Sequence, residues 1–122
     1  MTKATLGRAG AVAMAGIAAI HLVLAPEYLG KAPSIGVLFL LGAAAGAAVA
    51  FRLWRAPDLP AWALGTAIAA GMGVGFVLSR TVGLPGFFEA DWELSGVVPL
   101  LLELGFVGAA GAALARGSEV AA

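Results

Sequence analysis

Residues 94–115 read LSGVVPLLLELGFVGAAGAALA, an apolar stretch whose only charged residue is Glu103. An α-helix needs about 20 such residues to cross the hydrocarbon core of a bilayer, so this stretch predicts a membrane span. Three further apolar stretches precede it, at residues 9–25, 34–54 and 61–78. All are continuous apolar runs, whereas the strands of a membrane β-barrel alternate polar and apolar residues over about ten positions. The sequence therefore predicts an all-α fold, an integral membrane bundle of four transmembrane helices.

The composition of the whole chain also indicates a membrane protein. Hydrophobic residues make up 61% of the 122 residues and charged residues only 11%, whereas soluble domains contain about 25% charged residues. The formal net charge is zero, so no basic field favours a nucleic-acid partner. Cysteine is absent, which excludes disulfides and thiolate metal sites. We expect residues 1–122 to form a single domain that crosses the cell membrane several times and contacts the lipid bilayer.

Charge and proline mark the ends of the first two stretches. Pro26 and Glu27 follow the first stretch, and the segment 55–58, Arg-Ala-Pro-Asp, follows the second. The first stretch also has the basic start and apolar centre of a secretory signal peptide. A histidine in the apolar centre and a proline directly after Ala25 are unusual for such a signal. We therefore expect the first helix to be retained.

The distribution of basic residues predicts the orientation of the bundle. Cytoplasmic loops of membrane proteins carry an excess of lysine and arginine. One side of the predicted bundle carries Lys3, Arg8, Arg52, Arg55 and Arg116, and the other carries only Lys31 and Arg80. This pattern predicts that both termini lie in the cytoplasm.

Glu103 needs a partner or a function, because a charged carboxylate at the centre of a membrane helix costs about 2.5–3.5 kcal/mol on insertion scales. At 1.5 Å per residue, the only histidine, His21, lies roughly 6 Å from the outer end of its helix and Glu103 roughly 13 Å from the outer end of its own. Arg80 ends the third helix on the same side. These positions predict an outward-facing polar pocket with His21, Arg80 and Glu103 as candidate ligand-binding or proton-binding residues. Two structural roles stay open: a hydrogen bond from Glu103 to a neighbouring helix or subunit, and a neutral His21 bonded to a backbone carbonyl.

Pro99 and the small residues bear on how the helices pack. If Asp91 caps the last helix, Pro99 falls inside it and frees the carbonyl of Ser95; if Ser95 is the cap, Pro99 lies in the first turn. Small residues recur at four-residue spacing, which lets helices approach closely. They are Gly42 and Gly46 in the second stretch and Gly105, Ala109 and Ala113 in the last. Their partner helix could belong to this chain or to another.

The longest connection, residues 80–93, predicts an external loop rich in turns. Its three acids, together with Glu27, could hold a hard cation through carboxylate oxygens, although no calcium-loop spacing is present. The metal candidates are Glu89, Asp91 and Glu93. The alternative is a set of solvated acids that border an outer surface and a helix N-terminus. A haem with two histidine ligands would need a second histidine, which the chain lacks.

Two segments resemble a known group of proteins. Residues 21–29, HLVLAPEYL, and 79–85, SRTVGLP, are similar to segments of small four-helix integral membrane proteins of actinobacteria. The resemblance implies that His21, Glu27 and Arg80 belong to one constellation on the outer side, and it implies no particular chemistry. In that group a second histidine often takes the place of Tyr28, so the tyrosine argues against a metal bound by His21 and Glu27.

Several functions remain compatible with this sequence. No nucleophile–base pair, phosphate-binding loop or metalloprotease helix is present, and Gly71, Gly73 and Gly75 lie within a predicted helix, as packing glycines would. We therefore expect a small accessory or scaffolding subunit of a larger membrane assembly, with other membrane subunits or further copies of itself as partners, rather than an enzyme. The first alternative is binding or transport of a small solute, ion or proton by His21, Arg80 and Glu103. The second is a quinone-linked redox subunit. No cofactor can be named from the sequence.

Overall fold

The computed structural model describes the backbone of residues 2–121 and the side chains of residues 2–117. Its four helices are α1 (Lys3–Lys31), α2 (Pro33–Arg55), α3 (Leu59–Arg80) and α4 (Leu94–Ala121). All four are long and apolar enough to span a membrane. The predicted all-α, four-helix class is therefore confirmed, and the helices suggest a multi-pass membrane protein in contact with lipid.

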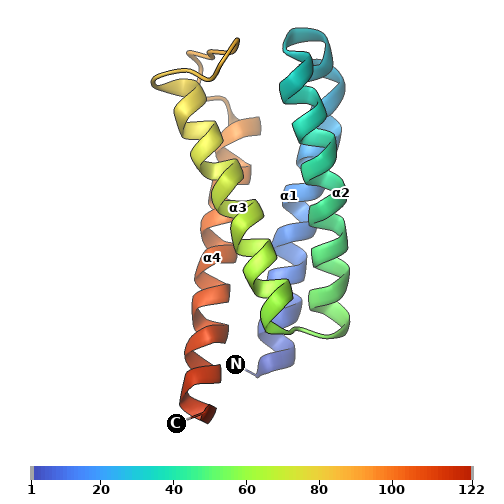
Figure 1. Cartoon of the computed structure of the whole chain (residues 1–122), viewed down its shortest axis with the longest axis vertical. Coiled ribbons are helices and arrows are strands. Elements are labelled where there is room, and N and C mark those ends of the chain that lie inside the picture. Colours follow the sequence, from blue (N-terminus) through green and yellow to red (C-terminus); the bar gives the residue numbers. More distant parts are fainter. Residues whose placement is uncertain (1, 122) are drawn as a thin grey trace.

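The helices form a bundle that is tighter at one end than at the other. α1 packs against α2 and α4, and α3 packs against α4 and more sparsely against α2. Figure 1 shows α3 close to α2 near the 56–58 connection and leaning away from it toward loop 81–93. Both chain ends lie at the end of the bundle opposite that loop (Figure 1).

The first helix is longer than predicted, because it continues past residue 25 and through Pro26 to Lys31. Proline removes an N–H donor and normally ends a helix, but membrane helices tolerate it where neighbouring elements compensate. Packing holds the turn beyond Pro26 in place. Tyr28 is buried, and its ring lies 4.6 Å from that of Phe39 on α2.

The turn between α1 and α2 is consequently very short. Ala32 alone joins the two helices, and its N–H donates to the carbonyl of Tyr28 at 2.7 Å. Pro33 begins α2, where its missing N–H removes no helical hydrogen bond. One turn later, an ideal Cβ built on Gly36 would lie 2.5 Å from the backbone nitrogen of Leu29. Only glycine allows α1 and α2 to approach this closely.

The hydrophobic core fills the half of the bundle nearest the termini. Its largest fully buried side chains come from three helices and are Met14, Ile17, Leu53 and Phe106. The small residues of α2 pack within this chain: Gly46 approaches Ala18 of α1, and Gly42 accommodates the end of Met72 from α3. On α4, Ala109 and Ala113 pack against the core, whereas a Cβ on Gly105 would contact nothing within 4 Å.

Candidate functional site

A cavity of about 460 Å³ occupies the half of the bundle opposite the termini. This volume lies in the range of about 300–1,000 Å³ that is typical of ligand pockets. Residues from all four helices and from loop 81–93 line it. The polar lining residues are His21, Tyr28, Ser79, Arg80, Glu93, Ser95 and Glu103. Three of the predicted site residues, His21, Arg80 and Glu103, thus face one cavity, and Glu27 is not among its lining residues.

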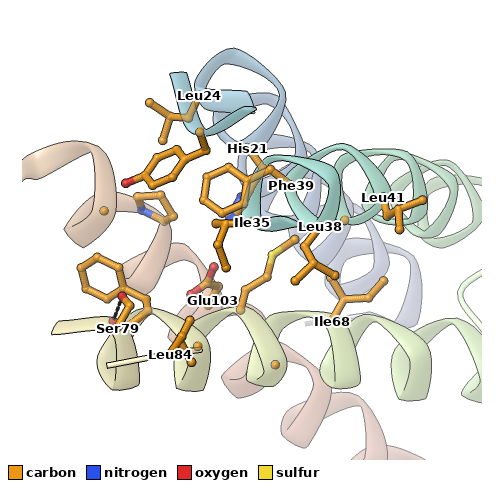
Figure 2. Close-up of a pocket in the computed structure, with 18 of the residues that line it drawn as sticks. His21, Leu24, Ile35, Leu38, Phe39, Leu41, Ile68, Ser79, Leu84 and Glu103 are labelled. Carbon is orange, nitrogen blue, oxygen red and sulfur yellow. Dashed lines mark hydrogen bonds between the residues drawn. The ribbon is translucent and has the colours of Figure 1, made fainter. Parts of the chain in front are cut away.

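Glu103 supplies a buried carboxylate to this cavity. The residue is only 4% exposed, and it makes no hydrogen bond or ion pair within residues 2–117. Among the described residues, no side-chain oxygen is both fully buried and without a hydrogen-bond partner. Since Glu103 has no partner, its carboxylate oxygens retain some accessible surface, and this surface faces the cavity that the residue lines. Figure 2 shows the carboxylate pointing from α4 toward the wall formed by Ile35 and Phe39. A Cβ on Gly73 would lie 3.4 Å from Glu103 Oε1, so this side chain crosses close to α3.

His21 reaches the cavity from α1 and is held by its own helix. Its Nδ1 lies 2.8 Å from the carbonyl oxygen of Ile17, and a carbonyl can only accept, so Nδ1 carries the proton. The bond to a backbone carbonyl considered for His21 is therefore confirmed. In the neutral ring, Nε2 is left as an acceptor. The ring packs edge-on against Phe39 at 4.8 Å, and no hydrogen bond joins His21 to Glu103 among the residues described.

Arg80 closes the end of the cavity near loop 81–93. Its Nη2 donates to Glu93 Oε1 at 2.6 Å, its Nη1 to Ser79 Oγ at 2.8 Å and its Nε to the carbonyl of Asp91 at 3.2 Å. The guanidinium also stacks 4.3 Å from the ring centre of Phe76. Every guanidinium nitrogen is thus occupied. The arginine ties the end of α3 to the loop and to the start of α4.

Two acids outside the cavity, Glu27 and Glu89, pair with Lys31. Lys31 Nζ lies 3.2 Å from Glu89 and 3.5 Å from Glu27. The hydrogen bond from Lys31 holds the pKa of Glu89 below its ordinary value. Within the described residues, no three histidine, aspartate or glutamate side chains come together as metal ligands. The metal prediction for Glu89, Asp91 and Glu93 therefore finds no support in the structure.

The start of α4 frees a further acceptor beside the cavity. The carbonyl of Glu93 accepts from the N–H groups of Gly96 and Val97, so Glu93 takes the cap position expected for Asp91 or Ser95. Pro99 consequently lies inside α4. It lacks the N–H that would bond the carbonyl of Ser95. Ser95 and Pro99 both line the cavity.

The cavity extends along the seam between α2 and α3. On the α2 side, Leu38 and Leu41 line it while remaining 60% and 61% exposed. On the α3 side, a Cβ added at Gly71 or Gly75 would meet nothing within 4 Å. Within this chain these two glycines do not pack against another helix, contrary to the expectation, and they form an open wall of the cavity. Leu38 of α2 and Ile68 of α3, both labelled in Figure 2, line this part of the cavity.

Sequence reasoning missed the apolar walls and the partner of Arg80. Tyr28, Phe39 and Phe76 line the cavity, but a phenylalanine that faces a cavity has the same sequence environment as one that faces lipid. Glu93 offered a usable signal, since it is a carboxylate on the same predicted side as Arg80 and directly precedes an apolar stretch.

Comparison of the chain with protein-family models, with curated proteins and with solved structures found no match in any of the three. Functional assignment therefore rests on the cavity and its side chains.

Proposed function

We propose that this protein binds a small solute in the cavity between α2 and α3, with Glu103 as the residue that contacts it. The supporting observation is the Glu103 carboxylate, which is 4% exposed, unpaired within the described residues and directed into a cavity of about 460 Å³. A carboxylate in an apolar setting is costly without a partner. A solute that supplies a donor or a positive charge removes that cost. His21 offers a second contact through Nε2.

Arg80 acts as a positioning residue in this proposal. Its three nitrogens are engaged by Ser79, Asp91 and Glu93, so it holds the end of the cavity in shape and does not contact the solute. Its role is to keep loop 81–93 over the polar end.

We further propose that both termini lie in the cytoplasm of a cell-membrane protein and that the cavity lies toward the outside. Five basic residues lie at the end of the bundle that carries the termini, against Lys31 and the ion-paired Arg80 at the other. The chain has no cysteine, so single-cysteine variants report orientation cleanly. Val82→Cys, at a side chain of loop 81–93 that is 81% exposed, should react with an impermeant maleimide in intact cells, and Lys3→Cys should not. The reverse pattern would exclude this orientation.

Native mass spectrometry of the protein, gently extracted from its own membrane, tests the binding proposal. We expect the wild type to carry a bound small-molecule mass and Glu103→Gln to lose it. Glu27→Gln is the matched control, because Glu27 is an exposed carboxylate outside the cavity, and it should keep the mass. A wild-type protein without any bound mass, or an unchanged mass in Glu103→Gln, would contradict the proposal.

A second candidate is the accessory or scaffolding role in a larger assembly. The observation that favours it is the row of Gly105, Gly108 and Gly111 on α4, where an added Cβ would meet nothing within 4 Å. Such a row permits close approach of a helix from another subunit or from a second copy. Gly108→Leu should release that partner on co-purification, and Val12→Leu on the exposed face of α1 should not. Unchanged co-purification of Gly108→Leu would argue against this surface.

A further inference from the structure

We propose that the solute is a protonated amine with an apolar body that lies along the α2–α3 seam. This inference rests on the proposed function, since it names the chemical class that the same cavity would take. The charge balance, the hydrogen-bonding groups and the walls of the cavity each support it.

The charge balance of the lining residues favours a cation. The positive charge of Arg80 is matched by Glu93 at 2.6 Å. Glu103 is then the one carboxylate among the described lining residues without a basic partner. An anionic group, such as a phosphate, would meet this carboxylate with no free positive charge to offset the repulsion. An ammonium group would pair with it in a setting of low dielectric, where opposite charges attract strongly.

The hydrogen-bonding groups of the cavity are mostly acceptors. His21 offers Nε2, Glu103 offers its carboxylate oxygens, and the backbone of Ser95 has a carbonyl freed by Pro99. Arg80 directs one N–H of each of its three nitrogens, three of its five donors, to protein partners, which fixes its orientation. The Tyr28 hydroxyl can donate or accept. A ligand with several N–H donors fits this set, whereas a quinone, which only accepts, would rely mainly on the hydroxyls of Tyr28 and Ser95.

The walls of the cavity suit an apolar body with a cationic head. The ring of Phe39 lies beside His21, and the ring of Tyr28 lies beside Phe39. Aromatic faces attract ammonium groups, and the Lys31 ammonium already lies 5.2 Å from the centre of the Tyr28 ring. From there the cavity continues between Leu38 and Met72 along the seam. Leu38 is exposed on a helix that is apolar enough to span a membrane, so this part of the cavity borders hydrocarbon. An alkyl or aryl chain would extend there.

Three probes with one skeleton test the ligand class: phenylbutylamine, phenylbutanol and phenylpentanoate. Binding is measured by titration calorimetry at neutral pH, with the full chain in nanodiscs of zwitterionic lipid and empty nanodiscs as the blank. We expect the wild type to bind the amine most tightly and the carboxylate least. Glu103→Gln should weaken amine binding by about 30-fold or more, as loss of one partner of a buried charge pair does. It should weaken alcohol binding far less, because the glutamine amide oxygen still accepts a hydrogen bond from the hydroxyl. Glu27→Gln should bind all three as the wild type does.

The comparison among probes on the wild type requires no variant, so the inference stays testable even if Glu103→Gln fails to fold. Equal binding of amine and alcohol, or tightest binding of the carboxylate, would overturn the amine assignment and leave solute binding in the cavity intact. Binding of none of the three would also overturn it. The native mass spectrometry measurement would then test independently whether the cavity binds a solute.

Discussion

Replacing Gly36 by alanine should disturb the α1–α2 hairpin more than any other single added methyl on its turn. The new Cβ would lie 2.5 Å from the backbone nitrogen and 2.7 Å from the Cα of Leu29, whereas ordinary contact begins at 3.4 Å. The helices must therefore separate by about 0.9 Å (3.4 − 2.5) at this point. Overpacking costs about 1–3 kcal/mol, and we take the upper part, about 2–3 kcal/mol, because backbone atoms cannot rotate away. Alanine returns about 1 kcal/mol of helix propensity.

The expected net loss of unfolding free energy is thus about 1–2 kcal/mol. The matched control is Gly108→Ala on α4, where the added methyl meets nothing within 4 Å and only the gain in helix propensity remains. Reversible unfolding in mixed micelles with increasing dodecyl sulfate gives both values. If Gly36→Ala proves as stable as Gly108→Ala within about 0.5 kcal/mol, the close approach of α1 and α2 deduced from Gly36 is wrong.

Three further outcomes follow from contacts elsewhere. Arg80→Gln should lower the unfolding free energy by about 1.5–3 kcal/mol, the range for hydrogen bonds to charged groups, and should speed amide exchange at Glu89, whose N–H bonds the carbonyl of Ser79 at 3.0 Å; unchanged exchange would contradict the role of Arg80 in holding the loop. The pKa of Glu89 lies below its ordinary value of 4.5 because Lys31 donates a hydrogen bond to it. The pair therefore contributes to stability above pH 4.5, and this contribution is lost as the pH falls through the lowered pKa. Carboxyl NMR titration should show a higher Glu89 pKa in Lys31→Gln, and an unchanged pKa would refute the pairing. Leu53→Ala removes a fully buried side chain and should cost about 2–5 kcal/mol, measured in the same micelle titration, where a loss below about 1 kcal/mol would place Leu53 outside a tight core.

The number and type of helices could be predicted from the sequence because hydropathy over about 20 residues is a local property. The C-terminal end of α1 could not be predicted in this way. Pro26 and Glu27 have the composition of a stop, yet the turn that follows is held by Tyr28 against Phe39 on the next helix. That contact exists only after the hairpin has formed. The local preference of Pro26 and Glu27 for a helix end was overridden by packing of α1 against α2, which a search for local sequence patterns does not detect.

The candidate site, too, could be predicted from the sequence only in part. Depth along the helices was enough to bring His21, Arg80 and Glu103 to one cavity, because the rise per residue fixes depth without knowledge of the packing. Depth does not fix rotation about the helix axis. It therefore could not foresee that His21 would bond Ile17 or that Arg80 would choose Glu93.

The open wall formed by Gly71 and Gly75 has a consequence for selectivity. Where a pocket is bounded by long side chains, rotamer changes let it adapt to guests of different size. Along this face of α3 the boundary is the helix backbone itself, which has no rotamers to adjust. The distance from the α3 backbone to the facing α2 side chains, Leu38 and Leu41, therefore limits the width of the guest. Alanine and then valine at Gly71 or Gly75 would narrow this gap stepwise. The size of the natural ligand can therefore be measured by finding the substitution at which the ligand no longer binds.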